Sequence, residues 1–158
     1  MRLTLDVPID VKIEENGETK ETLRVTLRYP TKEEEKQFKS FEKEIKELFK
    51  KLNKFEKDLQ KIDKKIEYAE KRGDYEKAEK LLDEREKVEN RLEKLANDFE
   101  AKGGENYPEE MAKKSFDLLV GGADKDRLRH YAEMVGYIKI MNLLREERDK
   151  LEKKQSGE

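Results

Sequence analysis

The sequence contains no cysteine, no tryptophan and a single histidine among its 158 residues. Without cysteine the chain can form neither a disulfide bond nor a thiolate metal site, so a reducing cytosol is the expected compartment. No apolar run approaches the roughly 20 residues of a membrane helix, and the N-terminus lacks the apolar core of a signal peptide. These absences predict a cytoplasmic protein with no membrane partner.

Motifs that carry catalysis are also absent. The only histidine, His130, has no neighbouring Cys or Asp that would indicate a metal site, and no GxSxG, HExxH or Walker motif occurs. The pairs Gly103-Gly104 and Gly121-Gly122 lack the lysine and hydroxyl that follow in a phosphate-binding loop. Carboxylates stand four residues from lysines, as Glu42 does from Lys46, which is typical of surface pairs on helices. We therefore predict a protein that is not an enzyme and uses no metal or cofactor.

Charge is abundant instead. Charged residues make up 48% of the chain and hydrophobic residues 34%, whereas an average globular protein is about 25% charged. The 37 basic and 39 acidic residues nearly cancel, unlike the large net charge that usually accompanies disorder. Dense charge of both signs favours long helices with solvent-exposed faces. A cluster of lysines between residues 50 and 65 leaves nucleic-acid binding as a lesser alternative.

The first thirty residues alternate between apolar and polar side chains. Period two predicts two strands that each bury one face; the apolar residues are Leu3, Leu5, Val7, Ile9, Val11 and Ile13, then Leu23, Val25, Leu27 and Tyr29. A two-residue Asn16-Gly17 loop would place odd residues opposite even ones, so we predict a three-residue loop from Glu15 to Gly17. That loop would pair Leu3 with Tyr29, Leu5 with Leu27, Val7 with Val25, and Ile9 with Leu23. Pro8 cannot donate a ladder hydrogen bond, so its strand should lie at a sheet edge.

The period changes to that of a helix after Thr31, which reads with Glu34 as a capping box. Apolar residues then recur at alternating steps of four and three, which predicts a coiled-coil helix from about Lys32 to Arg72; they are Phe41, Ile45, Leu48, Leu52, Phe55, Leu59, Ile62, Ile66 and Ala69. Gly73-Asp74 breaks the helix, and a second seam follows: Ala78, Leu81, Arg85, Val88, Leu92, Leu95 and Phe99. The tight break predicts an antiparallel helical hairpin over residues 32–102. Residues 39–65 carry ten basic and six acidic residues and residues 74–100 the reverse, so opposite charge should help the two arms pair.

Residues 103–158 form the third predicted segment, after the β-hairpin of residues 1–31 and the helical hairpin of residues 32–102. Pro108 opens a short helix that extends to Val120, and Gly121-Gly122 ends it. Asp124 is then expected to cap one final helix through Leu144 and beyond. The predicted fold is mainly α, with an N-terminal β-hairpin, a long antiparallel coiled-coil hairpin, and a C-terminal helical pair packing near the base of that hairpin.

Apolar residues in excess of the predicted cores are the candidates for partner binding. Phe49 lies off the first seam. The first predicted helix is longer than the second, and Phe38 lies in the N-terminal part that extends beyond it. In the last helix Met134, Tyr137 and Met141 belong to an apolar set that covers more than one face. These side chains either complete the core or form an exposed strip for a helical or extended client.

The N-terminal motif resembles the start of Mu-like phage tail assembly chaperones. The matching residues are Pro8-Ile9-Asp10-Val11, then Gly17, and Leu23-Arg24-Val25-Thr26-Leu27-Arg28-Tyr29-Pro30-Thr31. The resemblance covers about the first 35 residues, and the helical hairpin and C-terminal segment depart from that family. It implies a cytosolic phage or prophage factor that holds the tape-measure protein before the tail tube polymerises. No site residue is implied, because the shared motif is structural.

Together these patterns predict a non-enzymatic protein-binding or assembly module whose rigid arm presents apolar side chains to a client protein. The alternative is a structural coiled-coil spacer or a homo-oligomerisation element without a client. A sequence idealised by design is a further alternative, suggested by the dense Lys and Glu content, although the uneven arms and the irregular loop of residues 103–108 argue against it.

Overall fold

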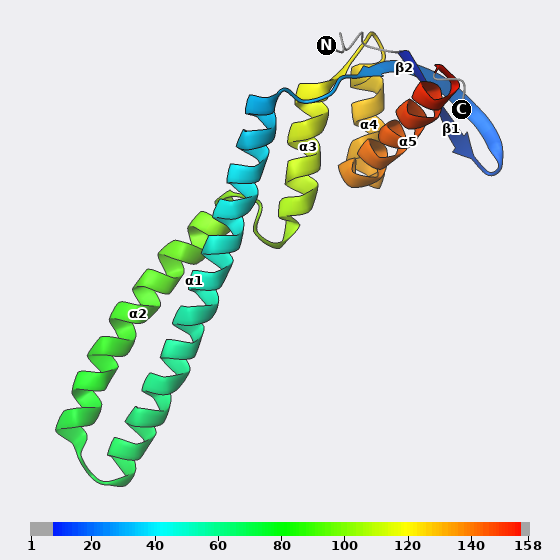
Figure 1. Ribbon diagram of the computed structural model, residues 1–158. Coiled ribbons are helices and arrows are strands. Elements are labelled where there is room, and N and C mark those ends of the chain that lie inside the picture. The colour runs from blue at the N-terminus through cyan, green and yellow to red at the C-terminus, as the bar shows by residue number, and fades with distance from the viewer. Residues whose placement is uncertain (1–7, 156–158) are drawn as a thin grey trace. The chain divides into compact units, whose positions relative to one another are not determined.

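A computed structural model describes residues 8–155 and confirms the mainly helical fold with its N-terminal β-hairpin and long helical hairpin (Figure 1). The elements are β1 (Pro8–Glu15), β2 (Glu18–Leu27), α1 (Lys32–Lys71), α2 (Tyr75–Ala101), the 3₁₀ turn η1 (Gly104–Asn106), α3 (Tyr107–Leu119), β3 (Val120–Gly121), α4 (Lys125–Val135) and α5 (Tyr137–Gln155). The described chain divides into two compact units. The terminal unit contains residues 8–38 and 106–155, and the coiled-coil unit contains residues 39–105.

From Pro8 to Leu27 the β-hairpin places its apolar side chains on one face, as the sequence predicts, but with a different register. Asn16 and Gly17 both have positive φ, 53° and 80°, so the loop has two residues in the backbone conformation of a type I′ turn. Glu15 pairs with Glu18, and the register then shifts so that Ile13 faces Glu21, which leaves Lys20 as a one-residue bulge. The predicted three-residue loop is therefore wrong.

The bulge changes which side chains meet across the two strands. Ile9 faces Val25 and Val11 faces Leu23, instead of the predicted pair of Ile9 with Leu23. The other three predicted pairs involve Leu3, Leu5 and Val7, which lie outside the described residues. Because the extra residue sits in β2 and not in the loop, odd positions still meet odd positions and one face stays apolar. β1 pairs with β2 alone among the described residues and lies at the edge of the sheet, as Pro8 indicates.

A third, very short strand was not foreseen in the sequence. Val120, predicted to be helical, pairs with Leu27, and Gly121 pairs with Thr26. A side chain at Gly121 would approach the Thr26 hydroxyl to 2.9 Å, and one at Gly122 would approach the Val25 Cα to 3.2 Å. The two glycines thus allow the backbone to lie directly against β2, where a helix could not continue.

The C-terminal region contains three helices, not the predicted pair, because Gly136 divides the last one. Gly136 has φ 103° and ψ 140°, a conformation that essentially only glycine adopts. Asp124 stands at the N-cap position of α4 but makes no side-chain bond to that helix. Its carboxylate instead accepts a 2.8 Å hydrogen bond from the backbone N–H of Arg24, so it ties the start of α4 to β2.

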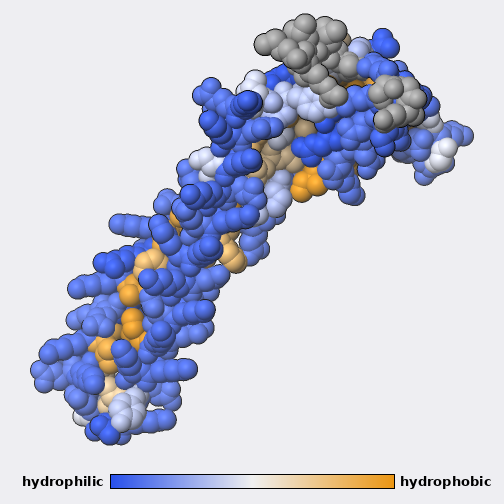
Figure 2. All heavy atoms as spheres, viewed as in Figure 1, coloured by the Kyte–Doolittle hydropathy of each residue, from blue (hydrophilic) through white to orange (hydrophobic). Residues whose placement is uncertain are grey.

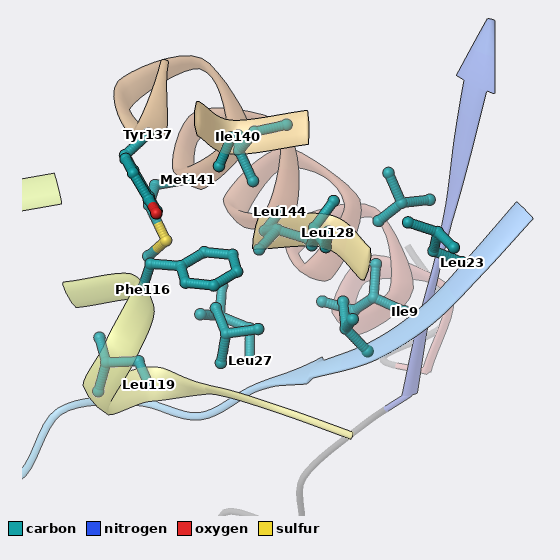
Figure 3. Packing of buried hydrophobic residues seen from close by; sticks show 14 residues of the cluster. Ile9, Leu23, Leu27, Phe116, Leu119, Leu128, Tyr137, Ile140, Met141 and Leu144 are labelled. Carbon is teal, nitrogen blue, oxygen red and sulfur yellow. The ribbon is translucent and has the colours of Figure 1, made fainter. Parts of the chain in front are cut away.

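The core of the terminal unit joins the two ends of the chain (Figure 3). The apolar face of β1 and β2 packs against side chains of α3, α4 and α5; the cluster is Ile9, Val11, Leu23, Val25, Leu27, Phe116, Leu119, Val120, Leu128, Ala132, Tyr137, Ile140, Met141 and Leu144. The Phe116 ring is fully buried and meets the Tyr137 ring edge-on at 5.4 Å. An isolated β-hairpin is marginal in water, so the C-terminal helices supply the cover that this one requires.

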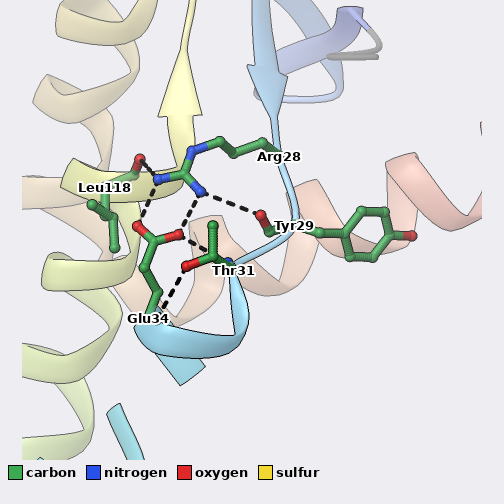
Figure 4. A network of polar contacts seen from close by, with 5 residues as sticks. All are labelled: Arg28, Tyr29, Thr31, Glu34 and Leu118. Carbon is green, nitrogen blue, oxygen red and sulfur yellow. Dashed lines mark hydrogen bonds and ion pairs between the residues drawn. The ribbon is translucent and has the colours of Figure 1, made fainter. Parts of the chain in front are cut away.

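A polar network fixes the passage from β2 into α1 (Figure 4). Thr31 and Glu34 form the predicted capping box: the Thr31 N–H donates to the Glu34 carboxylate at 2.9 Å, and the Glu34 N–H donates to the Thr31 hydroxyl at 3.2 Å. The Arg28 guanidinium binds both Glu34 carboxylate oxygens, at 2.6 and 2.7 Å, and also donates to the carbonyl of Leu118. This bidentate contact with Arg28, together with the Thr31 N–H, lowers the pKa of Glu34 to about 2.

The coiled-coil unit buries the predicted seams. Ile45, Ile66 and Ala69 of α1 are buried, as are Ala78, Leu81 and Phe99 of α2, and the remaining seam residues are partly covered. Gly73, with φ 74°, ends α1, and the Asp74 carboxylate accepts a hydrogen bond from the Lys77 N–H at the start of α2. The break and its cap are therefore as the sequence predicts.

The ion pairs observed between the two arms do not follow the net charges of the arms. Arg85 of the acidic arm binds Asp63 at 2.6 Å, and Lys102 binds Glu44 at 2.6 Å. In both pairs the cation belongs to the C-terminal side of the hairpin and the carboxylate to the basic arm. The overall excess of basic residues on α1 and acidic residues on α2 thus faces solvent in large part, and the apolar seam holds the pair together.

Candidate protein-binding surfaces

The five residues predicted to contact a partner occupy different environments. Tyr137 and Met141 are 3% and 1% exposed and belong to the core of the terminal unit, so they present no surface to a partner. Phe38 is partly covered. Phe49 and Met134 remain accessible, with 50% and 69% of their surface exposed. The apolar surplus of the last helix is explained by its division into α4 and α5, each of which buries its own apolar face.

The three most exposed large apolar residues of the terminal unit, apart from Tyr29 and Leu118 elsewhere on its surface, lie around the break at Gly136. Val135 is 48% exposed and Ile138 is 40% exposed, beside the still more exposed Met134. Sequence reasoning missed this grouping, because it treated residues 124–144 as one continuous helix. The available signal was the isolated glycine in Met134-Val135-Gly136-Tyr137, since glycine inside a helical pattern weakens the prediction of a continuous helix. We call Met134, Val135 and Ile138 the junction patch.

A carboxylate from a neighbouring helix holds the junction in place. Glu109 of α3 accepts hydrogen bonds from the backbone N–H groups of Tyr137 and Ile138 at the start of α5, the second at 3.3 Å. These N–H groups have no partner within α5 itself, and an anion there also interacts favourably with the helix dipole. A methyl group at Gly136 would lie 3.4 Å from the Glu109 carboxylate. The backbone that carries the junction patch is therefore constrained by the Glu109 hydrogen bonds and by the close contact at Gly136.

The exposed apolar residues of the coiled-coil unit flank the seam. The Phe49 ring lies 6.1 Å from the ring of Phe99, so one side of it is covered while the other faces solvent. Leu82 is 51% exposed and Tyr75 is 73% exposed. Apolar side chains reach the surface of this unit among charged ones (Figure 2). Leu82, which directly follows the seam residue Leu81, was not among the residues predicted from the sequence to contact a partner.

The edge of the sheet is the third surface on which a client could bind. A groove of about 420 Å³ runs beside β1; its lining residues are Asp10, Val11, Lys12, Glu14, Leu143 and Glu147. Pro8 at one end, Lys12 in the middle and the register shift beside Ile13 are features that discourage the addition of another strand. These features make the edge of β1 a poor site for the addition of an extended strand.

Charged contacts elsewhere in the terminal unit are structural. The Arg127 guanidinium donates to both carboxylate oxygens of Glu21 and, with the Tyr131 hydroxyl, lowers the pKa of Glu21 to about 2. This pair links α4 to β2. Burial and a hydrogen bond to Glu133 raise the pKa of Tyr137 to about 12.

His130 lies exposed on α4, with its ring 6.0 Å from that of Tyr131. Across residues 8–155 no three His, Asp or Glu side chains come together in a way that could hold a metal ion. Within the same residues, none of the helices has the length and apolarity needed to cross a membrane. Searches of protein-family models, curated proteins and solved structures give no match to this chain.

Proposed function

We propose that the protein is a non-enzymatic binding module that holds a helical client protein during assembly. The observation that carries this proposal is the exposure of Met134, Val135 and Ile138 on two helices whose junction is fixed by Glu109. Apolar side chains of this size, grouped on a rigid backbone, are typical of protein-binding surfaces. Met134 adds an unbranched side chain that adapts to different partners.

The finer form of the proposal follows from the N-terminal motif that resembles Mu-like tail assembly chaperones. In that form the client is a tape-measure protein, held in the cytoplasm of a phage-infected or lysogenic cell. The motif residues Ile9, Val11, Leu23, Val25 and Leu27 all point into the core of the terminal unit. They support a shared scaffold, and the client surface lies on other residues.

Photo-crosslinking in native host cells tests the proposal. A photoreactive phenylalanine analogue is placed at Met134, and in a matched control at Asp126, which is also exposed on α4. We expect one discrete protein to be crosslinked from position 134 and not from position 126. Only self-adducts at position 134, or equal adducts at both positions, would favour the alternative of a homo-oligomeric spacer and contradict the proposal.

A further inference from the structure

The α1–α2 hairpin has two flanks of opposite charge, a property hidden by the net charge of each arm. In a coiled coil the residues on either side of the seam form separate rows. Asp63 and Glu89 both bind Arg85 of the seam, so they lie on the same flank. Glu44 contacts Lys102 on the other flank, where a pocket is lined by Glu44, Glu47, Leu48, Lys51, Asp98 and Lys102.

The flank that contains Asp63 is strongly acidic. We define the acidic flank as the seam-adjacent row and the row beside it at heptad spacing: Glu42, Phe49, Glu56, Asp63, Glu70, Lys46, Asn53, Gln60 and Glu67 on α1, and Tyr75, Leu82, Glu89, Ala96, Glu79, Glu86, Glu93 and Glu100 on α2. It has ten carboxylates and a single lysine. The corresponding rows of the opposite flank hold ten basic and five acidic residues: Glu44, Glu47, Lys51, Lys54, Asp58, Lys61, Lys65, Arg72, Lys77, Lys80, Glu84, Lys87, Arg91, Lys94 and Asp98.

The acidic flank also carries three of the four exposed large apolar residues of the hairpin, namely Phe49, Tyr75 and Leu82, while the fourth, Tyr68, lies on the basic flank. Phe49 and Ala96 occupy its seam-adjacent rows, as do Leu82 and Tyr75, and the last two are seven residues apart on α2. Seven residues correspond to about 10.5 Å along a helix. A helix laid along the α2 row would therefore meet apolar side chains at Tyr75, Leu82 and Ala96, interrupted by Glu89, with further carboxylates in the neighbouring rows.

From this arrangement we propose that the acidic flank binds a basic amphipathic helix, which completes a three-helix bundle with α1 and α2. The complementary helix has apolar residues at heptad spacing and Lys or Arg beside them. The inference rests on the proposed function, since it names the chemistry of a helical client. Nucleic acid does not fit this flank, because both carry negative charge.

A second copy of the chain fits the acidic flank less well. The basic flank of another hairpin has the required charge, but its large apolar side chain is Tyr68, over which Arg72 stacks at 4.6 Å. Stacking of two hairpins would place charged side chains against Phe49 and Leu82. A basic helix with leucines at heptad spacing covers both residues and pairs with the carboxylates.

The test uses the full chain and a synthetic peptide of about four heptads, which spans about 42 Å when helical. The peptide has leucines at the seam positions and lysines beside them, and binding is measured by fluorescence anisotropy. Two matched triple variants on α2 separate the flanks: Glu79→Gln, Glu86→Gln and Glu93→Gln on the acidic flank, and Lys80→Gln, Lys87→Gln and Lys94→Gln one residue further along. All six side chains are exposed, so both variants should keep the fold, as circular dichroism can verify.

We expect binding in the micromolar range that weakens as salt rises, and a loss of about tenfold in the glutamate variant. The lysine variant should bind as tightly as the wild type or slightly more tightly. The double variant Phe49→Ser with Leu82→Ser should also lose about tenfold, because its apolar contacts are removed. Absence of binding, or equal loss in the two triple variants, overturns the inference.

Two further outcomes separate this inference from the proposed function. Dimers of the wild-type chain in light scattering that disappear in the glutamate variant would identify a second copy as the occupant and overturn the inference. Crosslinking of a client from position 134, combined with no binding of the basic peptide, would leave the proposed function standing while the acidic flank loses its assigned role.

Discussion

Replacement of Glu109 is expected to loosen α5 more than its sequence position suggests. Glu109 belongs to the first turn of α3, yet its carboxylate accepts from the Tyr137 and Ile138 N–H groups of α5. Loss of a capping side chain costs about 0.5–2 kcal/mol, and the interaction of a charge with the helix end adds about 0.3–1 kcal/mol. We expect Glu109→Ala to lower the free energy of unfolding of the terminal unit by about 1–2 kcal/mol. Glu109→Gln keeps an acceptor oxygen and should lose about half of that.

Urea unfolding measures this difference when it is combined with hydrogen exchange of the backbone amides from Tyr137 to Met141. Exchange should accelerate at the start of α5 in Glu109→Ala and remain unchanged in the coiled-coil unit. Glu110→Ala is the matched control, because Glu110 is the exposed neighbour on the same turn. Equal effects of the two substitutions would show that Glu109 acts only through the charge of α3, and the capping argument would be refuted.

Three other perturbations have defined outcomes. Hydrogen bonds from Arg28 and Arg127 lower the pKa values of Glu34 and Glu21 from the usual 4.5 to about 2 in the folded chain. The stability that these carboxylates contribute is therefore complete above about pH 4.5 and is lost as the pH falls toward 2. Urea midpoints measured over this range should fall less steeply in a Glu34→Gln variant than in the wild type. Leu92→Asp should reduce the helical circular dichroism signal of the coiled-coil unit, whereas Asn90→Asp on its exposed side should not, and retained helicity in Leu92→Asp would contradict the seam. Gly136→Ala, which must adopt φ near 103°, should lower the melting temperature by several degrees, and an unchanged melting temperature would mean that the α4–α5 junction adapts freely.

Periodicity predicts well those elements of this protein that depend on local apolar spacing and helix caps alone. The seams of α1 and α2 and the Gly73-Asp74 break follow from local spacing and caps, and each lies where the sequence places it. The β-hairpin shows the limit of the same reasoning. Parity correctly requires odd residues to face odd residues, but a bulge at Lys20 satisfies it as well as a longer loop does. The alternation of apolar residues determines which face of the sheet each side chain occupies. It does not determine where along the hairpin the extra residue lies.

The elements that escaped prediction depend on contacts between distant segments. β3 exists because Gly121 and Gly122 permit a close approach to β2, and nothing within residues 118–122 announces that approach. The junction patch depends in the same way on Glu109, which stabilises the start of α5 from another helix. A glycine that merely interrupts an apolar pattern is compatible with a continuous helix, and only the distant cap reveals the break.

Charge illustrates the difference between a sum along the chain and a distribution in space. Summed by arm, the hairpin consists of a basic and an acidic helix, which suggests that opposite charges were selected to hold the arms together. In the observed pairs, Arg85 with Asp63 and Lys102 with Glu44, the carboxylate comes from the basic arm and the cation from the acidic side, which is opposite to the net charges. Sorted by flank, the same residues give an acidic and a basic side, and the half-exposed Phe49 and Leu82 lie on the acidic one. Exposed ion pairs contribute little to stability. The separation of charge between the two flanks therefore acts mainly on which partners, by their own charge, can bind to each flank.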